Sequence, residues 1–133
     1  MREKLRLLVT ANALVGILFG MILLLVPDLL LRLYGMNTNP AGLLLARILG
    51  VEFIGYGILG WVLRNTDPAP AASPARAIVR AHVISESLGT LVTGWAALSG
   101  LGNLLLWSVV AVYGLMAICF IWASVALGGG APQ

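Results

Sequence analysis

Four ionisable side chains lie inside long apolar stretches of the sequence: Arg47, Glu52, His82 and Glu86. A charged group near the centre of a bilayer costs about 2.5 to 3.5 kcal/mol on insertion-based scales, so such residues are rare and mark the first place to look for function. Their types allow three kinds of chemistry. They could hydrogen-bond to one another and fix helix register, they could hold a proton or a ligand in a cavity, or they could bind a metal ion.

Helical spacing brings most of these residues onto common faces. In the third apolar segment, His82 and Glu86 share one face with small hydroxyl residues and glycine, while large apolar residues occupy the opposite face. In the second segment, Glu52 shares a face with Tyr56 one turn later. Depth can be counted at about 1.5 Å per residue from the segment ends on the side of the N-terminus. By this count Glu52, Tyr56, His82 and Glu86 lie at similar depths, and Asn12 of the first segment falls between them. The sequence therefore predicts one intramembrane polar cluster of Asn12, Glu52, Tyr56, His82 and Glu86.

Arg47 does not belong to this cluster, because it lies nearly opposite Glu52 around the helix and closer to the helix end. We expect its long side chain to extend toward lipid or a partner protein. Metal binding is the weakest alternative for the cluster, since one histidine and two carboxylates make a thin ligand set and paired Glu-x-x-His motifs are absent. Nucleophilic catalysis is not expected, because the sequence has no evident activated serine or cysteine at a suitable spacing from His82. We therefore predict no catalytic residue, no metal and no cofactor.

Composition indicates a membrane protein. Of the 133 residues, 60% are hydrophobic and 10% are charged, and the mean hydropathy is +1.01, whereas soluble domains carry about 25% charged residues. The net charge of +3 comes from eight Lys and Arg residues gathered mainly at segment ends, so no basic face for nucleic acid is expected. Because Cys119 is the single cysteine, an internal disulfide is excluded, and this residue lies in an apolar stretch.

Four apolar segments are long enough to span a bilayer. Asn39-Pro40 and Ser73-Pro74 precede the second and third segments as N-cap and first helical residue. A glycine-containing turn at residues 100–103 makes the last two segments antiparallel neighbours. We predict one all-α domain over residues 1–133, an integral membrane antiparallel four-helix bundle with spans at residues 5–26, 41–63, 77–99 and 104–127.

The connecting segments have their own patterns. Residues 27–35 place apolar side chains on one helical face and the Asp28–Arg32 pair on the other, which predicts a short interfacial helix after the first span. Residues 67–75 are rich in proline and alanine and are expected to form an extended linker, and residues 128–133 a frayed tail.

Orientation follows from the distribution of Lys and Arg around the predicted spans. Six of these residues lie on the side of the N-terminus and the 67–75 linker, and two lie on the other side. The six are Arg2, Lys4, Arg6, Arg64, Arg76 and Arg80, and the two are Arg32 and Arg47. We therefore expect a multi-pass protein of the cell inner membrane with both termini in the cytoplasm.

Small residues form stripes at helical spacing, including Gly16 and Gly20 in the first segment and Gly50 and Gly57 in the second. Such stripes let two helix backbones approach closely. We expect these stripes to pack helices of one chain together rather than to form a dimer interface.

The run Asn39-Pro40-Ala41-Gly42-Leu43-Leu44-Leu45-Ala46-Arg47-Ile48-Leu49-Gly50, followed by Gly55-Tyr56-Gly57 and a basic cap at Arg64, resembles small uncharacterised bacterial four-helix membrane proteins of the DoxX-like group. The resemblance covers the whole chain in layout. It implies a four-helix membrane bundle and assigns no catalytic residue.

Two functions remain open. The favoured one is a non-enzymatic membrane protein that acts through helix contacts, as a homo-oligomer or as a small accessory subunit of a larger membrane complex. Its other expected partner is the lipid bilayer, and no nucleic acid is expected to bind. The alternative is a small proton-coupled transporter or ligand-binding protein that uses the Glu and His cluster as an intramembrane cavity. A tightly packed cluster favours the first function and an open pocket favours the second.

Overall fold

A computed structural model describes residues 2–67 and 73–128. In this part of the chain all regular structure is helical, which confirms the predicted all-α class. The five helices are α1 (Arg2–Leu25), α2 (Pro27–Leu33), α3 (Pro40–Leu63), α4 (Pro74–Leu98) and α5 (Leu106–Gly128). The short helix predicted after the first span is present as α2, and it ends two residues before the predicted limit.

The sequence signals for helix boundaries act as expected. The Asn39 side-chain oxygen accepts a hydrogen bond from the Gly42 N–H at 2.9 Å, and Pro40 is the first residue of α3. Ser73 caps α4 in the same way, with its hydroxyl accepting from the Ala75 N–H at 3.2 Å. Because Pro74 occupies the first position of α4, this helix begins three residues before the predicted span.

Three of the described helices, α1, α3 and α5, are long and apolar enough to cross a membrane. They identify the chain as a helical membrane protein in contact with the lipid bilayer. α4 has 25 residues, but it is not among these three candidate spans. Its polar face, which includes His82 and Glu86, lowers its hydropathy.

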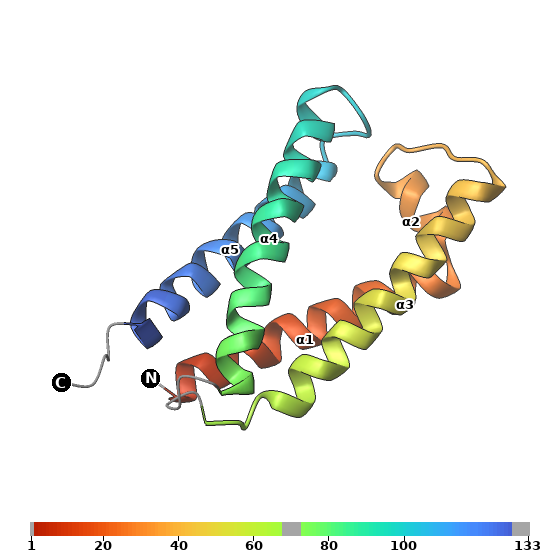
Figure 1. Ribbon diagram of the computed structural model, residues 1–133. Coiled ribbons are helices and arrows are strands. Elements are labelled where there is room, and N and C mark those ends of the chain that lie inside the picture. The colour runs from red at the N-terminus through yellow and green to blue at the C-terminus, as the bar shows by residue number, and fades with distance from the viewer. Residues whose placement is uncertain (1, 68–72, 129–133) are drawn as a thin grey trace.

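The long helices form two antiparallel hairpins, α1 with α3 and α4 with α5, as Figure 1 shows. Most contacts between helices lie within a hairpin. The hairpins approach each other at the end of the molecule where α1 and α4 begin, here called the N-terminal end, and diverge toward the opposite end, here called the loop end. The four long helices of the predicted antiparallel bundle are thus arranged as two hairpins that are joined mainly at one end.

Glycine residues bring the backbones of α1 and α3 together. A Cβ added to Gly50 would lie 2.7 Å from the Gly20 carbonyl oxygen, and one added to Gly57 would lie 2.8 Å from the Ala13 carbonyl oxygen. No side chain larger than hydrogen fits at these positions without moving a backbone. Two of the predicted small-residue stripes are thus used within the chain, in the first hairpin.

An apolar cluster joins the two hairpins at the N-terminal end. Phe120 is fully buried, with 0% of its surface exposed, and Val79 lies beside it at 1%. Residues from the first turns of α1 and the last turns of α5 complete this cluster: Leu5, Val9, Ala123 and Leu127.

Asn103 joins the hairpins at the loop end. Its backbone N–H donates to the Tyr34 carbonyl oxygen at 2.8 Å, and its side-chain Nδ2 donates to the Leu33 carbonyl oxygen at 2.9 Å. Gly102 has a positive φ of 75°, and an added Cβ would lie 2.7 Å from the same Tyr34 oxygen. The turn between α4 and α5 is thereby attached to the end of α2.

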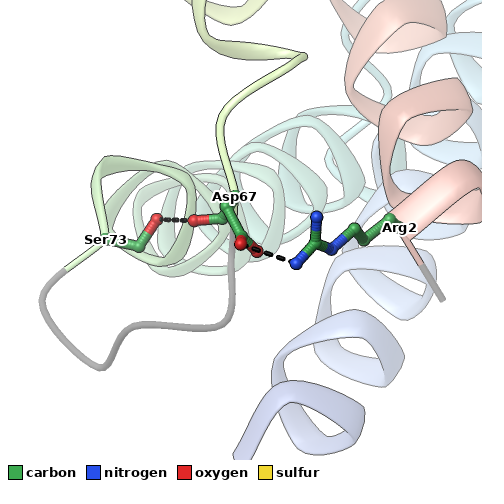
Figure 2. Close-up of polar contacts among 3 residues, drawn as sticks. All are labelled: Arg2, Asp67 and Ser73. Carbon is green, nitrogen blue, oxygen red and sulfur yellow. Dashed lines mark hydrogen bonds and ion pairs between the residues drawn. The ribbon is translucent and has the colours of Figure 1, made fainter.

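Polar contacts also tie the α3–α4 connection to α1, as shown in Figure 2. The Arg2 guanidinium contacts the Asp67 carboxylate at 2.6 Å, and the Ser73 hydroxyl donates to the Asp67 carbonyl oxygen. Residues 68–72 of the predicted linker, and residues 129–133 of the predicted tail, lie outside the described part of the chain.

Candidate functional site

The polar centre of the molecule is a contact among Asn12 of α1 and His82 and Glu86 of α4. The Asn12 amide nitrogen Nδ2 donates to Glu86 Oε1 at 3.1 Å and lies 3.3 Å from His82 Nε2. His82 and Glu86 are buried, with 3% and 7% of their surfaces exposed, and Asn12 is partly buried. This contact is therefore a buried polar link between the two hairpins.

The His82 ring also contacts the other two long helices. Its centroid lies 4.7 Å from that of Tyr56 on α3, in an edge arrangement, and 4.4 Å from that of Phe120 on α5. Its Nε2 atom meets the Asn12 amide, and its other ring nitrogen is Nδ1. This Nδ1 atom is buried and has no hydrogen-bond partner among the described residues.

A cavity of about 270 Å³ lies beside this polar centre, between the two hairpins. For comparison, an apolar cavity of about 150 Å³ is large enough to bind benzene. The walls come from all four long helices and from Tyr34 after α2. One wall is polar and includes Asn12, Tyr56, His82, Ser85 and Glu86, and the remaining walls carry Val15, Phe19, Phe53, Ser108, Val109, Val112 and Tyr113.

Glycine shapes one of these walls. A Cβ added to Gly89 would lie 2.4 Å from the Tyr113 ring, so the absence of a side chain lets this ring pack directly on α4. The threonines of the predicted polar face of α4 bond within their own helix, with the Thr90 hydroxyl donating to the Glu86 carbonyl oxygen at 2.8 Å and that of Thr93 to the Gly89 carbonyl oxygen at 2.7 Å. They add no free hydrogen-bonding group to the site.

The structure brings together four of the five residues of the predicted cluster, and it places Glu52 elsewhere. Glu52 is exposed and does not line the cavity. The reason lies in α3, whose buried face is set by the glycines that pack against α1. At about 100° per residue, Glu52 lies about 140° around the helix from Gly57, beyond the edge of that face. Arg47 is exposed on the same helix, away from the cavity.

The contribution of α5 to the site was not predicted from the sequence. Tyr113 lines the cavity and Phe120 packs against the His82 ring. These two aromatic residues are seven positions apart and therefore share one helical face. Because α5 is apolar around its whole circumference, no change of polarity marks this face, and the spacing of the two aromatic residues is the only signal.

No set of three His, Cys, Asp or Glu residues in the described ranges is arranged to hold a metal ion. Comparison with family models, with curated proteins and with solved structures gives no match. The structure and site define the chain as a helical membrane protein with an internal polar site. Its resemblance to the DoxX-like group remains a prediction from the motif at residues 39–50.

Proposed function

We propose that this protein binds a small, largely apolar molecule in the cavity between its two hairpins. The observation that carries the proposal is a cavity of about 270 Å³ with buried His82 and Glu86 on one wall. Ligand sites are mostly apolar with a few well-placed polar groups, and this cavity has that composition. A cluster serving only to hold helices together has no need of an adjoining space of this size.

The polar wall offers a ligand several hydrogen-bonding groups. Tyr56 and Ser85 line the cavity together with the Asn12–Glu86 contact, and the Ser85 hydroxyl, which donates to the His82 carbonyl oxygen, can still accept a hydrogen bond. Since a buried polar group without a partner costs free energy, a ligand that supplies partners here gains affinity and selectivity. In a proton-coupled form of this function, Glu86 and His82 would hold the proton, because Asn12 links both.

For the topology, we propose that α4 is a fourth span and that both termini lie in the cytoplasm of a bacterial cell, at its inner membrane. With 25 residues, α4 is roughly 37 Å long, enough to cross the hydrocarbon core. Its outer face carries exposed apolar residues such as Ile84, Leu88 and Leu91. Reporter fusions after residue 67 test this arrangement: a signal from outside the cytoplasm would contradict it.

The binding proposal is tested by identifying small molecules that accompany the protein from native membranes. Val109 lines the cavity and is half buried, so Val109→Trp fills the cavity. Val125, on the same helix, is 70% exposed and does not line the cavity, so Val125→Trp is the matched control. After purification in mild detergent, mass spectrometry should detect a molecule bound to wild type and to Val125→Trp but depleted severalfold from Val109→Trp. Identical contents of bound molecules in all three proteins would count against ligand binding in this cavity.

A second candidate function, assembly with another membrane chain, is favoured by the position of Glu52. This exposed carboxyl lies 12 residues, or roughly 18 Å, from the start of α3 and so near the middle of that candidate span. An ionisable group facing lipid there is costly, and a partner chain in a homo-oligomer or a larger complex would cover it. Glu52→Leu should then weaken the assembly seen by crosslinking in nanodiscs. A wild-type protein that is monomeric in nanodiscs and purifies without any other protein would exclude this function.

A further inference from the structure

We infer that the ligand of the cavity is an uncharged molecule dissolved in the bilayer, and that it enters sideways between α1 and α5. The inference rests on the proposed binding function and adds the class of ligand and its route. It follows from three observations: the contacts at each end of the cavity, the exposed apolar residues on its side, and its depth along α4.

The hairpins pack together at the N-terminal end of the cavity, and Tyr34 lies at its loop end, where they diverge. Toward the N-terminal end, the His82 ring lies against Phe120, and Phe120 and Val79 belong to the buried apolar cluster that joins the hairpins. Toward the loop end, Tyr34 lines the cavity and is held by the backbone N–H of Asn103. A molecule coming along the membrane normal from either aqueous side meets these contacts first.

The side of the cavity is different. Val15 of α1 and Val112 of α5 both line it, yet 42% and 45% of their surfaces are exposed. They belong to two candidate spans, so an opening beside them lies at the level of the hydrocarbon region. We call the opening flanked by Val15 and Val112 the apolar mouth. An apolar molecule can pass from lipid through this mouth without crossing a polar barrier.

The depth of the polar wall excludes a charged lipid headgroup as the ligand. His82 lies eight residues and Glu86 twelve residues from the start of α4, which is roughly 12 and 18 Å along the helix. Headgroups lie outside a hydrocarbon core about 30 Å thick, so they do not reach this level. No Lys or Arg lines the cavity in the described part of the chain, so no basic side chain there compensates an anionic group. A neutral hydrogen-bonding group on an apolar body fits both the route and the wall.

The experiment uses photolabelling of the full chain in phospholipid vesicles. The probe is 3-trifluoromethyl-3-phenyldiazirine, which is uncharged and partitions into the bilayer. Its derivatives bearing a carboxylate or a quaternary ammonium group are the charged counterparts. Labelled residues are identified by mass spectrometry, with attention to Asn12, Tyr56 and Tyr113 inside the cavity.

The uncharged probe should label these interior residues, and the charged derivatives should label them at least tenfold less. Val112→Trp, which fills the mouth, should reduce interior labelling severalfold, and Val15→Trp, on the other side of the mouth, should do the same. Val125→Trp is the matched control on the lipid-facing surface of α5 and should leave labelling unchanged.

The possible failures are distinguishable. Equal interior labelling by a charged derivative would overturn the uncharged ligand and the lateral route while leaving binding in the cavity intact. Undiminished labelling in both mouth variants would overturn the route through α1 and α5. Absence of interior labelling by every probe would show that the cavity takes up no small molecule, and the proposed function would fall with it.

Discussion

The seam inside the first hairpin and the seam between the two hairpins are built in opposite ways. Between α1 and α3, glycines let backbone touch backbone, as where Gly20 meets Gly50. Between the hairpins, large side chains meet at the N-terminal end around Phe120, and a polar link between Asn12 and His82 follows one turn later. Beyond that link the second seam opens into the cavity of about 270 Å³.

The difference shows where such a molecule can hold a ligand. A seam of backbone contacts has no free volume and no side chain that could be rearranged, so it can only fix two helices in register. A seam of bulky side chains keeps the helices apart, and where the hairpins diverge beyond the packed end, space remains between them. Each hairpin therefore forms one wall, and the candidate site lies between the two hairpins.

The largest expected effect is at the packed end of the second seam. Phe120→Ala removes a fully buried ring and should lower the free energy of unfolding by about 3 to 5 kcal/mol. Trp122→Ala, two residues further on the same helix, is the control, because 53% of the Trp122 surface is exposed. Reversible unfolding in detergent by increasing denaturant measures both. A loss for Phe120→Ala no larger than that for Trp122→Ala would mean that this end does not join the hairpins.

A single methyl group should disturb the glycine seam of the first hairpin. Gly50→Ala places a Cβ 2.7 Å from the Gly20 carbonyl oxygen, and since backbone cannot swing aside like a side chain, we expect a loss of about 1 to 3 kcal/mol. Gly55→Ala is the matched control, because an added Cβ there meets nothing within 4 Å. If thermal unfolding placed both variants at the wild-type midpoint, the close approach of α1 and α3 would be refuted.

The polar link in the second seam can be tested by two substitutions at Glu86. Glu86→Leu leaves the Asn12 amide without its acceptor and should cost on the order of 1 to 3 kcal/mol. Glu86→Gln keeps an acceptor oxygen in the same place and should unfold close to the wild-type temperature. Thermal unfolding in detergent separates the two. A Glu86→Leu protein as stable as wild type would show that this side chain makes no buried contact of consequence.

The smallest effect is expected outside both seams, at the ion pair of α2. The hydrogen bond from Arg32 lowers the pKa of Asp28 from its usual 3.8, and both groups are exposed. A lowered folded-state pKa stabilises only above the unfolded value, and this contribution is lost as the pH falls through the folded value. Because the pair is surrounded by water, Asp28→Asn should unfold at the wild-type temperature from pH 7 to pH 5. A clear drop at pH 7 would mean that the pair has a structural role.

Much of the helical layout could be predicted from the sequence, because local signals determine it. The Asn39-Pro40 and Ser73-Pro74 pairs mark the starts of α3 and α4, and apolar length marks the candidate spans. The division into two hairpins could not be predicted in this way. It depends on which glycine stripe faces which helix, and periodicity gives the face of a helix but not its partner.

The polar site shows the same limit. The spacing of His82 and Glu86 places them on one face, and the depth of Asn12 places it near them, so their contact follows from helical geometry. The position of Glu52 depends instead on how the Gly50 and Gly57 contacts rotate α3 about its axis. The cavity forms where the facing surfaces of the two hairpins are not in contact, so the sequence of any one helix cannot predict it.

The Asn103 contact at the loop end has a consequence for the order in which the molecule is assembled during synthesis. All residues of the first hairpin have been made once the chain reaches Leu63, so its glycine seam can close early. Asn103 bonds to Leu33, which is 70 positions earlier in the chain, and the partner of Asn12, His82, is also 70 positions away, so both contacts must form late in synthesis. The first hairpin can thus form before the second one docks on it, and the cavity is complete only when α5, the last helix of the described chain, has taken its place.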